Sequence, residues 1–232
     1  MRHNIKHATE RVDSFSNLNL RAMQKLLSFI SFLILLLMQT SLPAKNLVGK
    51  ILILGDSLSA AHNIAVDESW PVIFSASIRA KFPQATVINA SISGETTFGG
   101  VSRLPSLLEK HKPSHLIIEL GGNDGLRGLN FEQTTENLQQ MLAMAERNNV
   151  ATMVIGVRMP PNLGAAYNQQ FQAIFETVTS NSQAYYLPRF LEGVAASDPA
   201  LMQSDGIHPS ALAQPILAQK VWNALQQMLS VQ

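Results

Sequence analysis

Three residues whose types together can perform nucleophilic catalysis stand in short polar segments of this 232-residue chain. Ser57 lies in the polar segment 55–59, directly after an apolar run. A serine hydroxyl is a weak nucleophile, so it needs a base within hydrogen-bond reach and a third group that holds the base in one tautomer. His208 can act as that base, and Asp205, three residues earlier, can accept its Nδ1–H and leave Nε2 for the serine. We therefore predict that Ser57, Asp205 and His208 are the catalytic residues.

Two further polar segments supply donors for the negative charge that such a reaction develops. Asn123 carries a neutral amide NH₂, and Gly94 has no Cβ that would keep its backbone N–H away from a substrate. The N–H of Ser57, at the N-terminus of whichever helix follows, is the third donor. We predict an oxyanion hole formed by Ser57, Gly94 and Asn123. Each segment alone is typical of an ordinary helix cap or turn, and only their combination indicates a site.

Five short apolar runs, separated by stretches of helical period, must position these residues. Runs without polar alternation are typical of strands buried on both faces. The helical period is clearest at Leu138, Met141, Leu142 and Ala145. This alternation predicts a three-layer α/β/α fold around a five-stranded parallel sheet. The polar segments follow the strands, so they should meet at the carboxyl edge of the sheet, where such folds bind ligands. The predicted strands are residues 48–54, 86–89, 116–120, 152–157 and 184–187.

The composition excludes several classes of protein. With 46% hydrophobic and 14% charged residues the chain can fill a core, so it is not disordered. Its 17 basic and 16 acidic residues leave a net charge of +1, which argues against a nucleic-acid partner. It has no cysteine, so disulfides and thiolate metal sites are excluded. No glycine-rich signature of a nucleotide-binding loop occurs.

The first 44 residues differ from the rest of the chain. Lys25 precedes an apolar run over residues 26–38, and small residues follow, which is typical of a secretory signal. As a helix the run would reach roughly 20 Å, short of a bilayer core of about 30 Å. We predict a signal peptide over 1–44, with Met23 as a possible true start, and a single domain over 45–232 that is secreted to the periplasm without a stable membrane span. An uncleaved anchor is the alternative.

Taken together, the polar segments resemble the four sequence blocks of the SGNH (GDSL) hydrolase family, in the family's order. The segments are residues 55–59, Gly94, residues 121–124 and residues 205–209. The resemblance covers nearly the whole of 45–232, and it is greatest to a periplasmic subgroup. It implies a flavodoxin-like five-stranded sheet, no cofactor, and for the predicted triad and oxyanion-hole residues the roles given above.

The chain departs from that subgroup in two places. Ala61-His62 stands where the subgroup commonly has Gly-Tyr, and Pro161 adds a second proline after Pro160. The resemblance places both segments beside the pocket for the acyl group. The departures therefore bear on substrate preference.

We predict a serine esterase that hydrolyses thioesters and carboxylic esters of fatty acids through an acyl-enzyme on Ser57. The substrate is a small acyl ester or a lipid such as a lysophospholipid, and the protein is expected to be a monomer without a cofactor or a metal. Fatty acyl groups need an apolar groove near the nucleophile. The candidates for its walls are Leu126, Leu129, Met159, Pro160 and Leu163.

Three alternatives remain open from the residues alone. A carbohydrate O-deacetylase could use the same triad. A metal-dependent phosphohydrolase could use Asp56, Asp124 and Asp205. A non-catalytic module could bind acyl ligands without turnover.

The other ionisable residues are expected to have structural or peripheral places. Glu119, inside the third predicted strand, is expected to be a buried carboxylate with its hydrogen bonds satisfied. His62 is expected at the entrance of the site. His111 and His115 flank a turn, and nothing near them in the sequence completes a set of metal ligands.

Overall fold

The computed structural model of the chain describes residues 49–194 and 198–230. These residues lie in the second of the two units into which the chain divides, Leu47–Gln232. The predicted signal peptide at 1–44 and the possible start at Met23 lie outside the described residues and stay predictions. Within the described ranges, no helix has both the length and the apolar character that a bilayer crossing needs.

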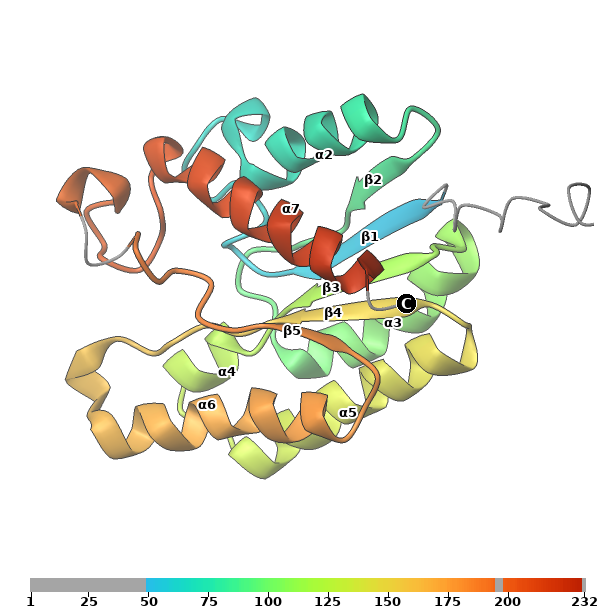
Figure 1. Ribbon diagram of the computed structural model, residues 1–232. Helices are drawn as coiled ribbons and strands as arrows, with labels where there is room; N and C mark the ends of the chain where they lie inside the picture. Colours follow the sequence, from blue (N-terminus) through green and yellow to red (C-terminus); the bar gives the residue numbers. More distant parts are fainter. Residues whose placement is uncertain (1–48, 195–197, 231–232) are drawn as a thin grey trace, which may run out of the picture. The chain divides into compact units, whose positions relative to one another are not determined.

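A five-stranded parallel sheet forms the centre of the described unit, with the strand order β2-β1-β3-β4-β5 (Figure 1). The interiors of its central strands are mostly apolar, and Ile51, Leu52, Ile53 and Leu54 have no solvent exposure. Burial on both faces explains why these runs lack polar alternation. The strands are β1 (Lys50–Gly55), β2 (Thr86–Asn89), β3 (His115–Glu119), β4 (Ala151–Ile155) and β5 (Tyr185–Leu187).

Helices cover both faces of the sheet, which confirms the predicted three-layer α/β/α fold (Figure 1). Helices α2 and α7 pack against each other over one face, and α3, α5 and α6 lie over the other. The apolar stripe predicted within α5 is buried at Leu138, Met141, Leu142 and Ala145. The helices are α2 (Trp70–Lys81), α3 (Thr97–His111), α4 (Gly122–Leu126), α5 (Phe131–Arg147), α6 (Ala165–Ser180) and α7 (Gln214–Ser230). Short 3₁₀ turns complete the chain path: η1 (Val66–Glu68), η2 (Pro161–Leu163), η3 (Pro199–Leu201) and η4 (Ala211–Ala213).

The strand order places a crevice at the carboxyl ends of β1 and β3. From β1 the chain crosses to the edge strand β2 and then returns to β3 on the other side of β1. Connections leave in opposite directions at such a switch point, and their loops leave an opening above the sheet. Ser57 follows β1 and Asn123 follows β3, so both residues lie at this opening.

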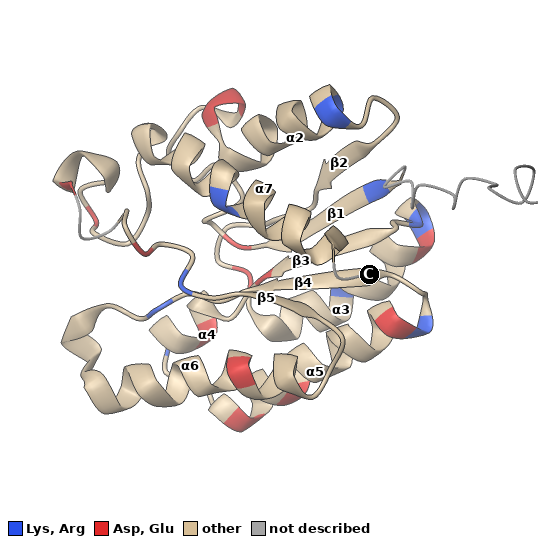
Figure 2. Ribbon diagram, in the orientation of Figure 1, with Lys and Arg blue, Asp and Glu red and all other residues tan. Residues whose placement is uncertain are grey.

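Charged residues of both signs are interspersed on the helices and loops of the described unit (Figure 2). Residues 45–232 hold 12 basic and 14 acidic residues. A surface for a polyanion would need a basic excess on one face. The interspersed charges of the described residues therefore do not favour a polyanionic partner.

Candidate active site

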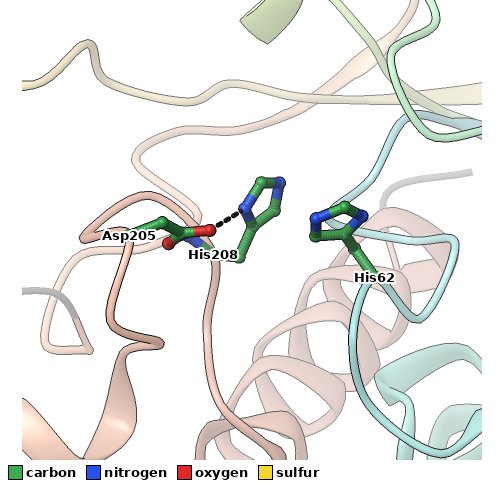
Figure 3. Close-up of side chains that lie close together, drawn as sticks. All are labelled: His62, Asp205 and His208. Carbon is green, nitrogen blue, oxygen red and sulfur yellow. Dashed lines mark hydrogen bonds and ion pairs between the residues drawn. The ribbon is translucent and has the colours of Figure 1, made fainter.

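Ser57, His208 and Asp205 form one hydrogen-bonded chain. The Nε2 atom of His208 lies 2.8 Å from Ser57 Oγ, and its Nδ1 atom lies 2.7 Å from Asp205 Oδ2. Figure 3 shows the carboxylate of Asp205 pointing toward the His208 ring. The structure thus brings together the three side chains predicted from the sequence, at the distances that an activated serine needs.

The loop that carries Asp205 and His208 is closed by its own hydrogen bonds. The Oδ1 atom of Asp205 accepts hydrogen bonds from the backbone N–H groups of Ile207 at 2.9 Å and His208 at 3.0 Å. An aspartate that bonds the backbone two or three residues later stabilises this kind of turn. The spacing of three residues therefore lets one carboxylate shape the loop with Oδ1 and orient the imidazole with Oδ2.

Asp205 is ionised at neutral pH, which determines the tautomer of His208. Burial opposes ionisation, but hydrogen bonds from His208 and Ile207 outweigh it and lower the pKa of Asp205 to about 2. A carboxylate only accepts, so Nδ1 of His208 carries the proton. The lone pair of Nε2 is then free to accept the hydroxyl proton of Ser57.

Ser57 sits in a turn, not at the start of a helix, so the expected helix-dipole contribution at its N–H is wrong. The backbone N–H groups of Ser59 and Ala60 donate to the carbonyl oxygen of Asp56 at 3.2 Å and 3.0 Å. The turn continues through Asn63, and within it Ala61 adopts a left-handed conformation with φ +57°. This conformation favours glycine, which is the residue of the similar subgroup at that position.

Two backbone donors point to no acceptor in the described part of the chain. Neither the N–H of Ser57 nor the N–H of Gly94 donates a hydrogen bond to a described residue. Gly94 has φ +81°, a left-handed conformation that a residue with a Cβ rarely adopts. Both groups are therefore available for the oxyanion of a tetrahedral intermediate.

Asn123, the second residue of α4, is held in place by both hydrogens of its amide. Nδ2 donates to Asp56 Oδ2 and to the backbone carbonyl oxygen of Glu95, both at 3.0 Å. Because both acceptors lack protons, the amide has only one orientation that satisfies them. A negatively charged oxygen is a stronger hydrogen-bond acceptor than a neutral carbonyl. An oxyanion can therefore accept the hydrogen bond that Asn123 donates to the Glu95 carbonyl oxygen in the free enzyme.

Two buried acids, Asp56 and Glu119, lie beneath this site at the carboxyl ends of β1 and β3, where Figure 2 shows acidic segments. Glu119 Oε2 accepts a hydrogen bond from Ser59 Oγ at 2.7 Å, while Oε1 has no partner among the described residues. Burial raises the pKa of Asp56 to about 6. Burial and the charge of Asp56 raise the pKa of Glu119 well above its ordinary value.

This acid pair was not predicted from the sequence. Glu119 was expected to have its hydrogen bonds satisfied, but only one of its carboxylate oxygens has a partner among the described residues. The sequence does contain an indication of the pair, because Asp56 directly follows β1 and Glu119 ends β3, the two strands that flank the switch point. The β1–β3 register then sets Gly55, the neighbour of Asp56, directly opposite Glu119.

The acid pair should make the protein less stable as the pH rises. A group whose pKa is raised by folding binds more protons in the folded state, so the free energy of unfolding falls with pH above the unfolded value. For Asp56 this window runs from 3.8 to about 6, and each pH unit costs about 1.4 kcal/mol. Glu119→Gln removes one of the two acids. Its free energy of unfolding should therefore fall less than that of the wild type between pH 4.5 and pH 8.

Urea unfolding at several pH values measures this difference. Glu109→Gln removes an exposed acid on α3 and serves as the control, since it should keep the wild-type pH dependence. If the free energy of unfolding changed with pH by the same amount in the wild type and in Glu119→Gln, ionisation of the buried acid would not be the cause of the lost stability.

A cleft of about 990 Å³ opens beside Ser57. Leu126, Met159 and Pro160 line it, as predicted from the sequence. Pro161, the second proline of the segment expected beside the acyl pocket, also lines the cleft. Further apolar walls come from residues that were not predicted from the sequence, namely Leu58, Val157, Leu191, Met202 and Ile207. The charged residues Arg158, Glu176, Arg189 and Glu192 line other parts of the cleft, so an acyl chain can be held along its apolar walls.

Leu129 and Leu163 do not line this cleft, although both were predicted to do so. Helix α4 ends at Leu126, and Gly128 with φ +64° then redirects the chain before Leu129. Leu163 ends η2, and its side chain is 40% exposed. The apolar character of a loop residue does not indicate where its side chain points, because that direction depends on the backbone turns around it.

The three carboxylates of the alternative metal-dependent hydrolase do not come together. Asp124 is buried and bonds Thr97 through both carboxylate oxygens. Asp56 faces Asn123, whereas Asp205 faces His208. Among the described residues, the group whose metal-ligating atoms lie close together contains Asp205 but neither of the other two.

The remaining histidines differ in their surroundings. Burial lowers the pKa of His115, and its Nδ1 atom lies 2.9 Å from Ser114 Oγ, so this ring is part of the packed interior. His111 ends helix α3. His62 lies beside His208, with the two ring centroids 4.2 Å apart (Figure 3).

Comparison with known proteins agrees with this geometry. A model of the GDSL-like lipase/acylhydrolase family matches residues 53–214. The chain is 39% identical over 179 residues to the esterase TesA of Pseudomonas aeruginosa, covering 77% of this chain and 89% of that protein. It is 40% identical over 180 residues to thioesterase 1/protease 1/lysophospholipase L1 of Escherichia coli K12, covering 78% of this chain and 85% of the relative.

A solved structure shows the same fold. The psychrotrophic esterase EstA from Pseudoalteromonas sp., in a crystal structure inhibited by monoethylphosphonate, has a TM-score of 0.74 at 35% identity over 78% of this chain and 98% of that one. The family model covers well over half of the chain, and its residues include the serine turn, both oxyanion-hole loops and the Asp205–His208 loop. The chain is an ester-hydrolysing enzyme and belongs to the GDSL-like lipase/acylhydrolase family.

Proposed function

We propose that this enzyme hydrolyses esters and thioesters of fatty acids, including lysophospholipids, through an acyl-enzyme on Ser57. The observation that carries the proposal is the hydrogen-bonded chain from Asp205 through His208 to Ser57, at the mouth of an apolar cleft. The names of the relatives, an esterase and a thioesterase/lysophospholipase, support the same substrate class.

In the first half of the reaction, Ser57 Oγ attacks the acyl carbonyl carbon and Nε2 of His208 takes the hydroxyl proton. The carbonyl oxygen becomes an oxyanion, which the N–H groups of Ser57 and Gly94 and the amide of Asn123 stabilise. When this intermediate collapses, the bond to the leaving alcohol or thiol breaks. His208 gives that group its proton, and the acyl group stays on Ser57.

In the second half, water replaces the leaving group. His208 takes a proton from the water, whose oxygen attacks the acyl carbon, and a second oxyanion forms in the same hole. Its collapse breaks the bond to Oγ, and His208 returns the proton to Ser57. The products are a free carboxylic acid and the regenerated enzyme.

The size of the cleft favours a fatty acyl group over an acetyl group. An acetyl ester would fill only a small part of about 990 Å³, whereas a long chain can cover the apolar walls at Leu126 and Met159. Met159 is flexible and polarizable, so it can adapt to chains of different length. The O-deacetylase alternative uses the same triad but leaves these walls without a function.

We expect kcat/KM to rise with acyl chain length well beyond two carbons. Burying one methylene is worth about 0.8 kcal/mol, so each added carbon can raise kcat/KM by up to roughly fourfold until the cleft is full. A series of p-nitrophenyl esters from acetate to dodecanoate, measured below their aggregation limits, tests this. A maximum at acetate would favour the O-deacetylase.

Two leucines of equal exposure provide a matched control for that series. Leu126 and Leu163 are both 40% exposed, but only Leu126 lines the cleft. Leu126→Ala should lower kcat/KM for dodecanoate and leave acetate nearly unchanged, while Leu163→Ala should change neither. An equal loss in both variants would mean that the cleft does not hold the acyl chain.

Export to the periplasm is part of the proposal. Its support is the basic residue, the short apolar run and the small residues within 1–44, which are typical of a cleaved secretory signal. Fractionation of cells that express the full chain tests the location. The expected monomeric state of the protein stays a prediction.

A further inference from the structure

We propose that His62, Asp205 and His208 form a binding site for a divalent transition-metal ion such as Zn²⁺, and that a bound ion inhibits hydrolysis reversibly. This regulatory role rests on the proposed function, because two of the three ligands belong to the triad. The binding site itself rests only on the positions and chemistry of the three side chains.

The three side chains lie close enough together for one ion. One ligand atom from each residue lies within 4.8 Å of the other two. Figure 3 shows the His208 ring between the carboxylate of Asp205 and the ring of His62. The group is open to solvent, since Asp205 is exposed and both histidines are only half-buried.

The donor set is one that Zn²⁺ commonly binds. Imidazole nitrogens and carboxylate oxygens bind it at about 2.0–2.2 Å, so tetrahedral ligand atoms lie roughly 3.3 Å apart, and water can fill the fourth position. Asp205 Oδ2 and His208 Nδ1, at 2.7 Å, are slightly closer than this. The ion would therefore require small side-chain rotations that separate this pair and bring His62 inward.

His62 has a ring that is free to bind a ligand. Its nitrogens form no hydrogen bond or ion pair with the rest of the described chain. The side-chain amide of Gln203 holds the backbone nearby, donating to the carbonyl oxygen of His62 at 2.9 Å and to that of Pro209 at 3.0 Å. This bridge connects the turn after Ser57 to the loop of His208, so the third ligand is already placed beside the triad.

Metal binding and catalysis exclude each other at His208. Both of its ring nitrogens are engaged, Nδ1 with Asp205 and Nε2 with Ser57. If the ion took Nε2, the base would have no lone pair for the serine proton. If it took Nδ1, that nitrogen would lose its proton and its hydrogen bond to Asp205, so the ring would no longer be held for Ser57.

Activity assays in the presence of Zn²⁺ test the regulatory effect. Increasing Zn²⁺ should inhibit hydrolysis of p-nitrophenyl butyrate by the untagged protein, and EDTA should restore it. The zinc response of His62→Ala is measured relative to the zinc-free turnover of that variant. It should need at least about tenfold more Zn²⁺ for half inhibition, since losing even an outer partner costs a metal site about that much. His111→Ala, which changes a histidine on α3, should keep the wild-type response.

Calorimetry separates the metal site from the proposed catalytic role. Ser57→Ala protein should bind one Zn²⁺ per chain, and adding His62→Ala should weaken this binding at least about tenfold. Binding to Ser57→Ala that depends on His62 supports the site even if Ser57 proves not to be the nucleophile. Equal zinc inhibition of His62→Ala and wild type, or zinc binding that does not depend on His62, would overturn the proposal.

Discussion

Replacing Ser57 by alanine should reduce kcat by roughly 10⁶-fold, the loss that removal of a serine nucleophile causes in enzymes of this chemistry. Without Oγ no acyl-enzyme can form, and the base His208, 2.8 Å away in the wild type, has no hydroxyl to deprotonate. What remains is the weaker effect of binding and of the oxyanion donors on direct attack by water. Hydrolysis of p-nitrophenyl esters measures the loss.

A covalent probe checks the same assignment without a substrate. A fluorophosphonate should add once to the wild type at Ser57, and Ser57→Ala should take up no label. Ser93→Ala removes an exposed serine next to Gly94 and should label like the wild type. An adduct on another serine, seen by peptide mass spectrometry, would contradict the assignment.

Replacing Asn123 by alanine should lower kcat by about 10²- to 10³-fold with little change in KM, the usual cost of losing one oxyanion donor. The amide is held by Asp56 and the Glu95 carbonyl before the reaction, and one of its N–H groups donates a hydrogen bond to the oxyanion as charge develops. Because that interaction exists only in the transition state, its loss affects kcat and kcat/KM alike. Full kinetic curves for one ester separate the two constants.

The matched control for this variant is Asn148→Ala. Asn148 is an exposed asparagine after α5 whose amide donates to the carbonyl oxygen of Met144 at 2.8 Å. It should leave both constants unchanged. A rise in KM alone for Asn123→Ala would show that the amide binds the ground state and does not stabilise the oxyanion.

The strands and most of the site could be predicted because their signals are local. The interior of a strand buried on both faces is apolar, as in β1, where Ile51, Leu52, Ile53 and Leu54 have no solvent exposure. The edge strand β2, although partly exposed, also occurs at the predicted residues 86–89. The pairing of Asp205 with His208 spans one short loop, so its spacing is visible in the sequence. The carboxyl edge of a parallel sheet then gathers the loops that follow the strands, which is how Ser57 and Asn123 come to lie at one opening.

Other parts of the site depend on contacts between distant segments. Asp56 and Glu119 are neighbours only because of the register between β1 and β3, and nothing in either segment alone specifies it. Leu126 enters the cleft and Leu129 does not, because Gly128 redirects the chain between them. Apolar character predicts burial but not the direction of a loop.

By itself, the sequence determined the three-layer fold and the family, and it predicted the nucleophile and its base. These features come from periodicity and from short motifs whose residues lie near each other along the chain. Only the tertiary structure decided that the ring centroids of His62 and His208 lie 4.2 Å apart. It also decided that the buried acids Asp56 and Glu119 lie next to each other beneath the site. The physical reason is that such contacts depend on the left-handed conformation of residues such as Ala61 and on the register between strands. Both bring together segments that are far apart in the sequence, and neither segment contains a motif that indicates the other.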